Sequence, residues 1–168
     1  MPARVLVLFR NDLRVHDNPV LHQAAEAVKS GEASEVLPVY CFDPRFFGVT
    51  KYGHPKTGAF RAQFQLESVL DLKARLKTLG SDLLVAVGRP EDVVAGLLQE
   101  RGNLVLTQEE TCSEELRVDR KVRSVVRARP QSDLRQVWGS TLFHREDLPF
   151  DRQTLRDMPD VFTPFKEK

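Results

Sequence analysis

Five short apolar runs alternate along the chain with longer segments that carry helix signals, and this alternation constrains the fold more than any other feature. The runs cover residues 5–9, 36–40, 83–87, 104–106 and 134–138. Most of their residues are β-branched or otherwise bulky, as is typical of strands. Strands that alternate with helices pair in parallel through right-handed crossovers. The order therefore predicts an α/β fold with a doubly wound, five-stranded parallel sheet and helices on both faces.

The segments between these runs have recognisable helix ends. Asn18 can cap a first helix, Pro19 occupies its preferred first position, and Gly31 follows its last turn. A second helix is predicted over about 57–79, a third over 90–102, and a fourth from near Ser113 to before Pro130. The second carries a broad apolar stripe that periodicity assigns to the core. Its members are Phe60, Phe64, Leu66, Val69, Leu70, Leu76 and Leu79.

Two of the five strand predictions include residues that suit a sheet edge. Pro38 cannot donate to a strand ladder, so the second run needs an edge or a bulge there. Arg135 and Gln136 indicate an edge position for the last run. The other runs are continuously apolar, which predicts strands that are covered on both faces. Ligands in such Rossmann-like sheets bind beyond the carboxyl ends of the strands.

The helix and strand signals end after Trp138. Residues 139–168 carry Pro149, Pro159 and Pro164 among many charges, without a convincing period. Seven of the large apolar side chains in this segment predict that part of it is held against a surface. We therefore expect an α/β domain over 1–138 and an irregular connector over 139–168. The seven are Phe143, Leu148, Phe150, Leu155, Val161, Phe162 and Phe165.

Charge and composition exclude several classes of protein. Lys and Arg total 25 against 24 Asp and Glu, so no global field favours nucleic acid or an anionic membrane, and strong nucleic-acid binding is not expected. Only Cys41 and Cys112 are present, which favours free buried thiols over a disulfide framework. No run is long enough to span a bilayer and no signal peptide is visible. These features predict a cytoplasmic protein, or an organellar one if a transit peptide has been removed.

Common catalytic and nucleotide-binding motifs are missing from the sequence. No glycine-rich loop follows the first run, so a dinucleotide or triphosphate cradle is disfavoured. The four histidines, His16, His22, His54 and His144, lack zinc-site spacing and are expected at the surface. There is no Gly-x-Ser-x-Gly elbow, and neither cysteine has a sequence-adjacent base.

One long motif carries a family resemblance. Residues 9–19 read Phe-Arg-Asn-Asp-Leu-Arg-Val-His-Asp-Asn-Pro, which closely resembles the opening signature of photolyases and cryptochromes. Physically, it places two guanidiniums and several short acceptors on one strand-to-helix turn. Asp12 and Asp17 are expected to fix Arg10 and Arg14 there. For any single residue of this motif, a structural role in a turn held by internal salt bridges is at least as good an interpretation as contact with a ligand.

Further blocks are similar to the DASH branch of this family, in the family's order. They cover residues 41–45, 56–64, 110–115, 137–144 and 147–150. The resemblance implies an antenna domain that holds a folate, 5,10-methenyltetrahydrofolate. In the family, FAD, the electron path and the DNA cavity belong to a following helical domain, which is the expected partner. The chain alone is then not expected to carry out light-driven DNA repair of the deoxyribodipyrimidine photolyase type.

Four residues are candidates for folate binding. Glu109 and Glu110 follow the fourth run, and a carboxylate can pair with the amidine-like edge of a pterin. The resemblance favours Glu110, which opens the Glu-Thr-Cys-Ser-Glu-Glu block; helix capping is the alternative role. Phe42 and Phe46 can cover a ring, although a core or interface role fits them equally.

A second hypothesis assigns the chain no chromophore. It is a non-catalytic interaction module in which the fold and the apolar connector bind a partner protein. Retention of a near-ultraviolet chromophore separates the two hypotheses.

Overall fold

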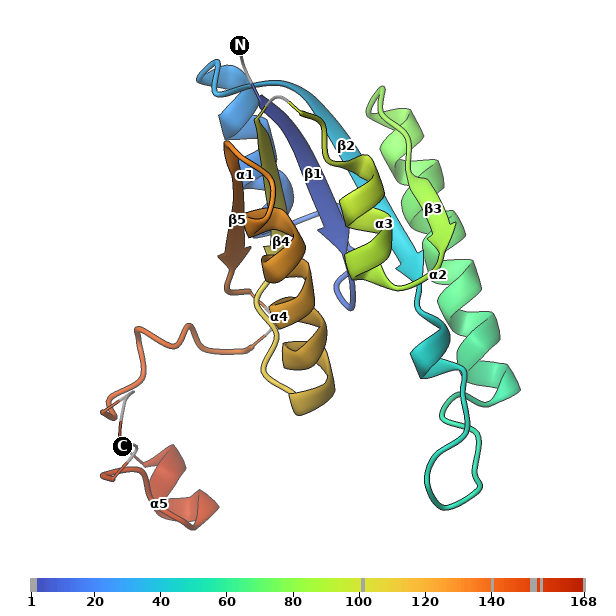
Figure 1. Cartoon of the computed structure of the whole chain (residues 1–168). Helices are drawn as coiled ribbons and strands as arrows, with labels where there is room; N and C mark the ends of the chain where they lie inside the picture. The colour runs from blue at the N-terminus through green and yellow to red at the C-terminus, as the bar shows by residue number, and fades with distance from the viewer. Residues whose placement is uncertain (1–2, 101, 140, 152–153, 155, 168) are drawn as a thin grey trace.

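The five predicted strands form one parallel sheet in the order β3-β2-β1-β4-β5 (Figure 1). The computed structural model describes residues 3–100, 102–139, 141–151, 154 and 156–167. All four strand pairings are parallel. The doubly wound α/β prediction is therefore confirmed. The strands are β1 (Ala3–Phe9), β2 (Ala33–Phe42), β3 (Leu84–Val87), β4 (Asn103–Gln108) and β5 (Ser132–Val137).

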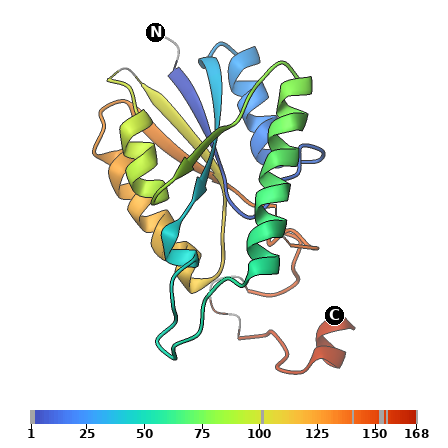
Figure 2. The same cartoon turned by 90° about the vertical axis from the view of Figure 1, so that its right-hand side faces the viewer.

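Four helices cover the sheet, two on each face (Figure 2). The helices α1 (Pro19–Lys29) and α2 (Ala59–Thr78) lie on one face, and α3 (Pro90–Leu97) and α4 (Ser113–Arg127) lie on the other. Asn18 caps α1 as predicted, because its side-chain oxygen accepts from the backbone N–H groups of Val20 and Leu21 at 3.0 and 3.1 Å.

Two apolar layers, one on each side of the sheet, form the core. In β1, Val5, Val7 and Phe9 pack toward α1 and α2, whereas Leu6 and Leu8 pack toward α3 and α4. This alternation follows from the two-residue period of a strand. All six residues of β4 are buried, as the continuously apolar pattern predicts for a central strand.

The edge prediction is confirmed for β5, and for β2 it holds only locally, at Pro38. β5 ends one side of the sheet, whereas β2 as a whole lies between β1 and β3. Pro38 is accommodated because β3 pairs with β2 only from Val39 onward, so β2 has one neighbour at that point. The other edge is β3, whose apolar run is not covered on both faces: Val87 is 81% exposed.

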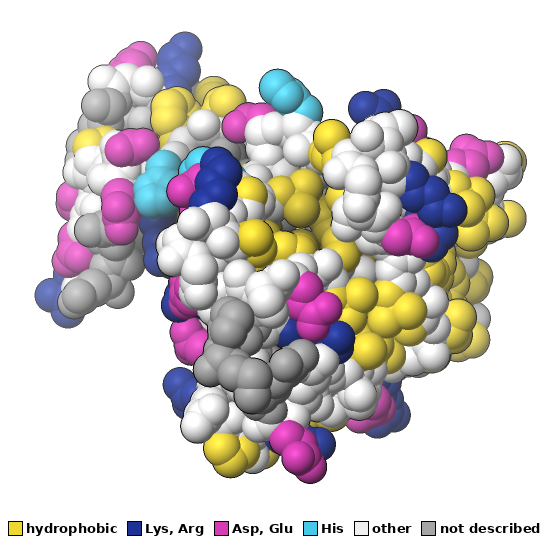
Figure 3. Space-filling view, turned by 90° about the horizontal axis from the view of Figure 1, so that it is seen from above, with side chains coloured by type: hydrophobic (Ala, Val, Ile, Leu, Met, Phe, Trp, Pro, Cys, Tyr) yellow, Lys and Arg dark blue, Asp and Glu magenta, His cyan; other side chains and the backbone are white. Residues whose placement is uncertain are grey.

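The apolar stripe predicted for α2 is core only in part. Val69 and Leu76 are buried, together with Leu72, but the other five members are exposed by 50 to 91%. At about 100° per residue, Phe60, Phe64, Leu66 and Leu70 lie well around the helix from the face of α2 that packs on the sheet through Val69, Leu72 and Leu76. The exposed five are Phe60, Phe64, Leu66, Leu70 and Leu79. At the opposite end of the sheet, apolar side chains also reach the surface between charged ones (Figure 3).

Cysteine and histidine positions agree largely with expectation. Both cysteines are free; Cys41 is buried, but Cys112 is exposed, so the prediction of two buried thiols was wrong for Cys112. Burial raises the pKa of Cys41 to about 12. The four histidines are exposed, as predicted. Among the described residues, no helix combines the length and apolarity needed to cross a membrane.

The segment after β5 is irregular, apart from α5 (Phe162–Lys166). Its aromatic side chains contact one another: Phe165 stacks on Phe150 and Phe162 with ring centroids 5.4 and 6.5 Å apart. Phe150 is 6% exposed, whereas Phe143 is 61% exposed. The domain boundary between 138 and 139 stays a prediction. Ser140, Leu155 and Lys168, which belong to the predicted connector, lie outside the described residues.

Candidate functional site

Glu110 lies at the carboxyl end of β4, beside the residues that follow β1. The Nδ2 group of Asn11 donates a hydrogen bond of 2.8 Å to Oε1 of Glu110. Burial raises the pKa of Glu110, although the charge of Arg10 and the bond from Asn11 lower it. The parallel sheet thus brings residues 99 positions apart in sequence into contact at its ligand-facing end.

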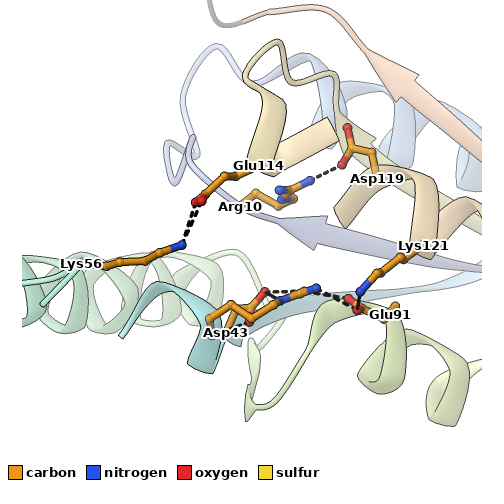
Figure 4. Close-up of polar contacts among 8 residues, drawn as sticks. Arg10, Asp43, Lys56, Glu91, Glu114, Asp119 and Lys121 are labelled. Carbon is orange, nitrogen blue, oxygen red and sulfur yellow. Dashed lines mark hydrogen bonds and ion pairs between the residues drawn. The ribbon is translucent and has the colours of Figure 1, made fainter. Parts of the chain in front are cut away.

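Arg10 forms a buried ion pair with Asp119 of α4 (Figure 4). Their side chains are 7% and 6% exposed. The second oxygen of Asp119 accepts a hydrogen bond of 2.8 Å from Nε2 of Gln136 in β5. The pair therefore joins the turn after β1 to α4 and β5.

The sequence-based expectation for Arg10 was wrong, and that for Arg14 was correct in part. Asp12 binds Arg14 through two hydrogen bonds of 3.0 Å, but neither Asp12 nor Asp17 pairs with Arg10. The signal that identifies Asp119 is its position among Val118 and Val122 on the apolar face of α4. A carboxylate on a buried helix face needs a cationic partner.

A second buried cluster holds the turn after β2. Arg45 donates to Asp43 at 2.6 Å and to Glu91 at 2.8 Å, and both carboxylates are nearly buried. Burial alone would raise the pKa of each carboxyl, but hydrogen bonds from Arg45 outweigh it and hold both pKa values below their ordinary range. Lys121 of α4 approaches Glu91 at 3.5 Å (Figure 4).

The structure places the four predicted site residues in different surroundings. Phe46 lines a small cavity of about 60 Å³ together with Arg10 and with Asn11, which donates to Glu110. Phe42 instead packs edge-on against Tyr40, with ring centroids 5.0 Å apart, and lines a groove between α2 and β3.

Glu109 faces away from its neighbour Glu110. One of its oxygens accepts a hydrogen bond of 2.6 Å from Arg145 in the segment after β5, and its backbone N–H donates to the carbonyl of Val137. The structure thus places Phe46 beside Asn11, the hydrogen-bond partner of Glu110, whereas Glu109 and Phe42 have other partners.

A larger open hollow of about 760 Å³ adjoins the Arg10 and Asn11 side of this end. It lies between the turn after β1 and the first half of α2. Gln65, which donates a 2.6 Å hydrogen bond to the hydroxyl of Tyr40, lines it together with Arg61 and Phe64. Sequence reasoning missed these α2 residues as site candidates, because only the fold brings α2 beside the turn.

Comparison with known proteins assigns the family. A profile of the DNA photolyase family matches residues 5–168. The chain belongs to the DNA photolyase family. Cryptochrome DASH of Danio rerio is 45% identical to it over 166 residues, and cryptochrome DASH of Gloeobacter violaceus is 44% identical over 165 residues. These alignments cover 97% and 98% of the chain, but 30% and 31% of the relatives.

Solved structures of photolyase-family members agree with this assignment. A Synechocystis cryptochrome superposes with a TM-score of 0.87 at 41% identity, covering 99% of this chain and 33% of that one. An archaeal photolyase from Sulfolobus tokodaii, described as containing two FAD molecules, superposes with a TM-score of 0.68 at 26% identity, covering 84% and 32%. The chain therefore matches the N-terminal domain of the photolyase family, and spans about a third of the length of these relatives.

Proposed function

We propose that this domain is the antenna module of a DASH-type photolyase or cryptochrome and binds 5,10-methenyltetrahydrofolate. The observation that carries the proposal is the half-buried Glu110 carboxylate, held by Asn11 at the ligand-facing end of the sheet. A carboxylate in such surroundings can accept two hydrogen bonds from the amidine-like edge of a pterin. When bound, the folate would supply near-ultraviolet absorption and pass its excitation energy to a flavin.

The surroundings of Glu110 fit a pterin in two further respects. Phe46 and the small cavity beside Asn11 offer apolar cover at the same end. The hollow lined by Arg61 and Phe64 leaves room for the rest of the ligand. Glu109 and Phe42 remain weaker candidates. Arg145 already donates a hydrogen bond to Glu109, and Phe42 lines a different groove.

The charge of Glu110 gives the direct test of folate binding. In Glu110→Gln, we expect affinity for 5,10-methenyltetrahydrofolate to fall about ten- to a hundredfold, since a hydrogen bond to a charged group contributes about 1.5–3 kcal/mol. Titration followed by the near-ultraviolet absorbance that co-elutes with protein measures this. Glu109→Gln is the matched control and should change affinity less than threefold. Equal losses in both variants, or a wild-type chain that binds no folate, would contradict the proposal.

The proposed site also predicts a pH dependence. A pterin edge that donates to Glu110 needs the ionised carboxylate, and burial raises the pKa of Glu110 above its ordinary value of 4.5. Affinity should therefore fall on acidification at a pH higher than an exposed glutamate would give. In Glu110→Gln, this pH dependence should disappear from the binding curves.

We further propose that FAD and the DNA-repair chemistry belong to a helical domain that this domain contacts, and that the chain alone does not repair DNA. The exposed rings of Phe60 and Phe64, at 91% and 71%, support a docking surface on the first turns of α2. The same exposure favours the second candidate function, an interaction module without a chromophore.

Docking can be tested by mixing the chain with a separately expressed flavin-binding helical domain of a DASH relative. Phe60→Ser combined with Phe64→Ser should abolish co-elution and change the free energy of unfolding by less than about 0.5 kcal/mol, because both rings are at the surface. Undiminished co-elution of this variant would place the docking surface elsewhere.

A further inference from the structure

Helix α4 carries more basic than acidic residues, although the whole chain is nearly neutral. Between Ser113 and Arg127 it has five Lys or Arg and three carboxylates, those of Glu114, Glu115 and Asp119. Asp119 points inward to Arg10, with its side chain 6% exposed. Glu114 pairs with Lys56, so the outward face of α4 keeps a net positive charge.

Three arginines form the centre of this face. Arg117, Arg120 and Arg127 are exposed, and none forms an ion pair with the described part of the chain. Their spacings of three and seven residues place them on one side of the helix, spanning about 15 Å. The hydroxyls of Ser113 and Ser124 share this side, since they lie four residues from Arg117 and Arg120 respectively.

A hollow of about 630 Å³ adjoins the amino-terminal half of this face, between α4 and the segment that follows β2. Its charged lining consists of five cations and one carboxylate, that of Glu114. Glu114 is occupied by Lys56 at 2.9 Å, and Lys121 shares Glu91 with Arg45 (Figure 4). The cations are Arg45, Lys56, Arg117, Arg120 and Lys121.

The arginine and serine side chains of this face are suited to binding phosphodiester groups. Guanidiniums bind phosphate oxygens bidentately, and serine hydroxyls commonly contact nucleic-acid backbones. Cores of protein interfaces are instead rich in aromatic anchors and poor in charge. In the described α4, Leu116 is the one large apolar side chain with substantial exposure, at 40%.

We propose that the outer face of α4, formed by Arg117, Arg120, Lys121 and Arg127, binds the phosphate backbone of nucleic acid without reading its sequence. This proposal goes beyond the antenna function and does not depend on folate. Because only about four cations take part, binding is weak, with a Kd of about 1–100 µM near physiological salt. Weak binding by one face is compatible with the balanced charge of the whole chain, because that balance argues only against strong binding by the entire surface.

Fluorescence anisotropy of a labelled DNA duplex of arbitrary sequence, titrated with the 168-residue chain at several salt concentrations, tests the proposal. Four phosphate contacts predict a slope of about −3.6 in a plot of log Kobs against log salt. In Arg120→Gln combined with Arg127→Gln, the slope should become shallower by about 1.8, and affinity at low salt should fall at least about tenfold.

Arg75→Gln combined with Lys77→Gln removes the same charge from exposed positions of α2, on the other face of the sheet, and serves as the control. It should leave duplex binding within about twofold of the wild type. The circular dichroism spectra of both double variants should match that of the wild type, because the substituted side chains are exposed. The proposal fails if the two variants weaken binding equally, if no duplex binding occurs at low salt, or if a polyglutamate peptide competes as well per charge as DNA does.

Discussion

Arg10→Met should lower the free energy of unfolding by about 3–5 kcal/mol, because it leaves the carboxylate of Asp119 buried without its cation. Both partners are more than nine-tenths buried, so water cannot replace the missing guanidinium. Denaturant unfolding at neutral pH, followed by circular dichroism, measures the loss. Arg14→Met is the matched control: Arg14 is 56% exposed in its pair with Asp12, so water screens the pair and the expected loss is much smaller than in Arg10→Met.

A second variant separates the buried charge from lost packing. Adding Asp119→Leu to Arg10→Met removes the stranded carboxylate and should recover at least half of the lost stability. Recovery is not complete, because Nε2 of Gln136 then loses its acceptor. A loss below about 1 kcal/mol in Arg10→Met would show that the pair does not hold the turn after β1 to α4.

Arg10→Met should also change the electrostatics of the proposed folate site. The charge of Arg10 lowers the pKa of Glu110 and opposes the effect of burial. Arg10→Met should therefore raise the pKa of Glu110 further and move the acid loss of folate affinity to higher pH. A variant that folds but shows an unchanged pH profile would indicate that Arg10 does not act on this carboxylate.

The positions of the strands and the starts of the helices were predictable from the sequence, because each depends on local signals, whereas α3 ends at Leu97 and not at the predicted residue 102. The run at 104–106 is apolar without interruption and became the fully buried β4, and Asn18 with Pro19 marked the start of α1. The extent of burial along α2 was predicted wrongly, because the apolar stripe was drawn too broadly. Phe60 and Phe64 lie more than about 90° around the helix from the centre of the buried face, so they point away from the sheet.

The candidate site was predictable only where one segment contains its parts. The pair of Asp12 and Arg14 lies within a single turn and was anticipated, whereas Arg10 and Asp119 are 109 positions apart and were not. Likewise, two adjacent glutamates look equivalent in sequence. The alternation of side-chain directions at the end of β4 sends Glu110 toward Asn11 and Glu109 toward Arg145.

Arg45→Met should destabilise the fold by about 3–5 kcal/mol at neutral pH, because Arg45 compensates two nearly buried carboxylates at once. Asp43 and Glu91 are 3% and 8% exposed in these pairs, and Lys121 approaches Glu91 at 3.5 Å, whereas the cation paired with Asp43 is Arg45. Thermal and denaturant unfolding measure the effect. Arg75→Met, which breaks an exposed pair with Asp71 on α2, should cost less than about 0.5 kcal/mol.

The pH dependence of this loss gives the sharper test. In the wild type, the pKa values of Asp43 and Glu91 are lowered, so their contribution to stability is present above the ordinary values of 3.8 and 4.5 and is lost as the pH falls through the folded-state values. In Arg45→Met, burial without a cation raises both pKa values, and protonation then relieves the destabilisation. The difference in unfolding free energy between wild type and variant should therefore shrink steadily on acidification. A difference that stayed constant with pH would mean that Arg45 stabilises the turn through packing of its side chain and not through the two carboxylates.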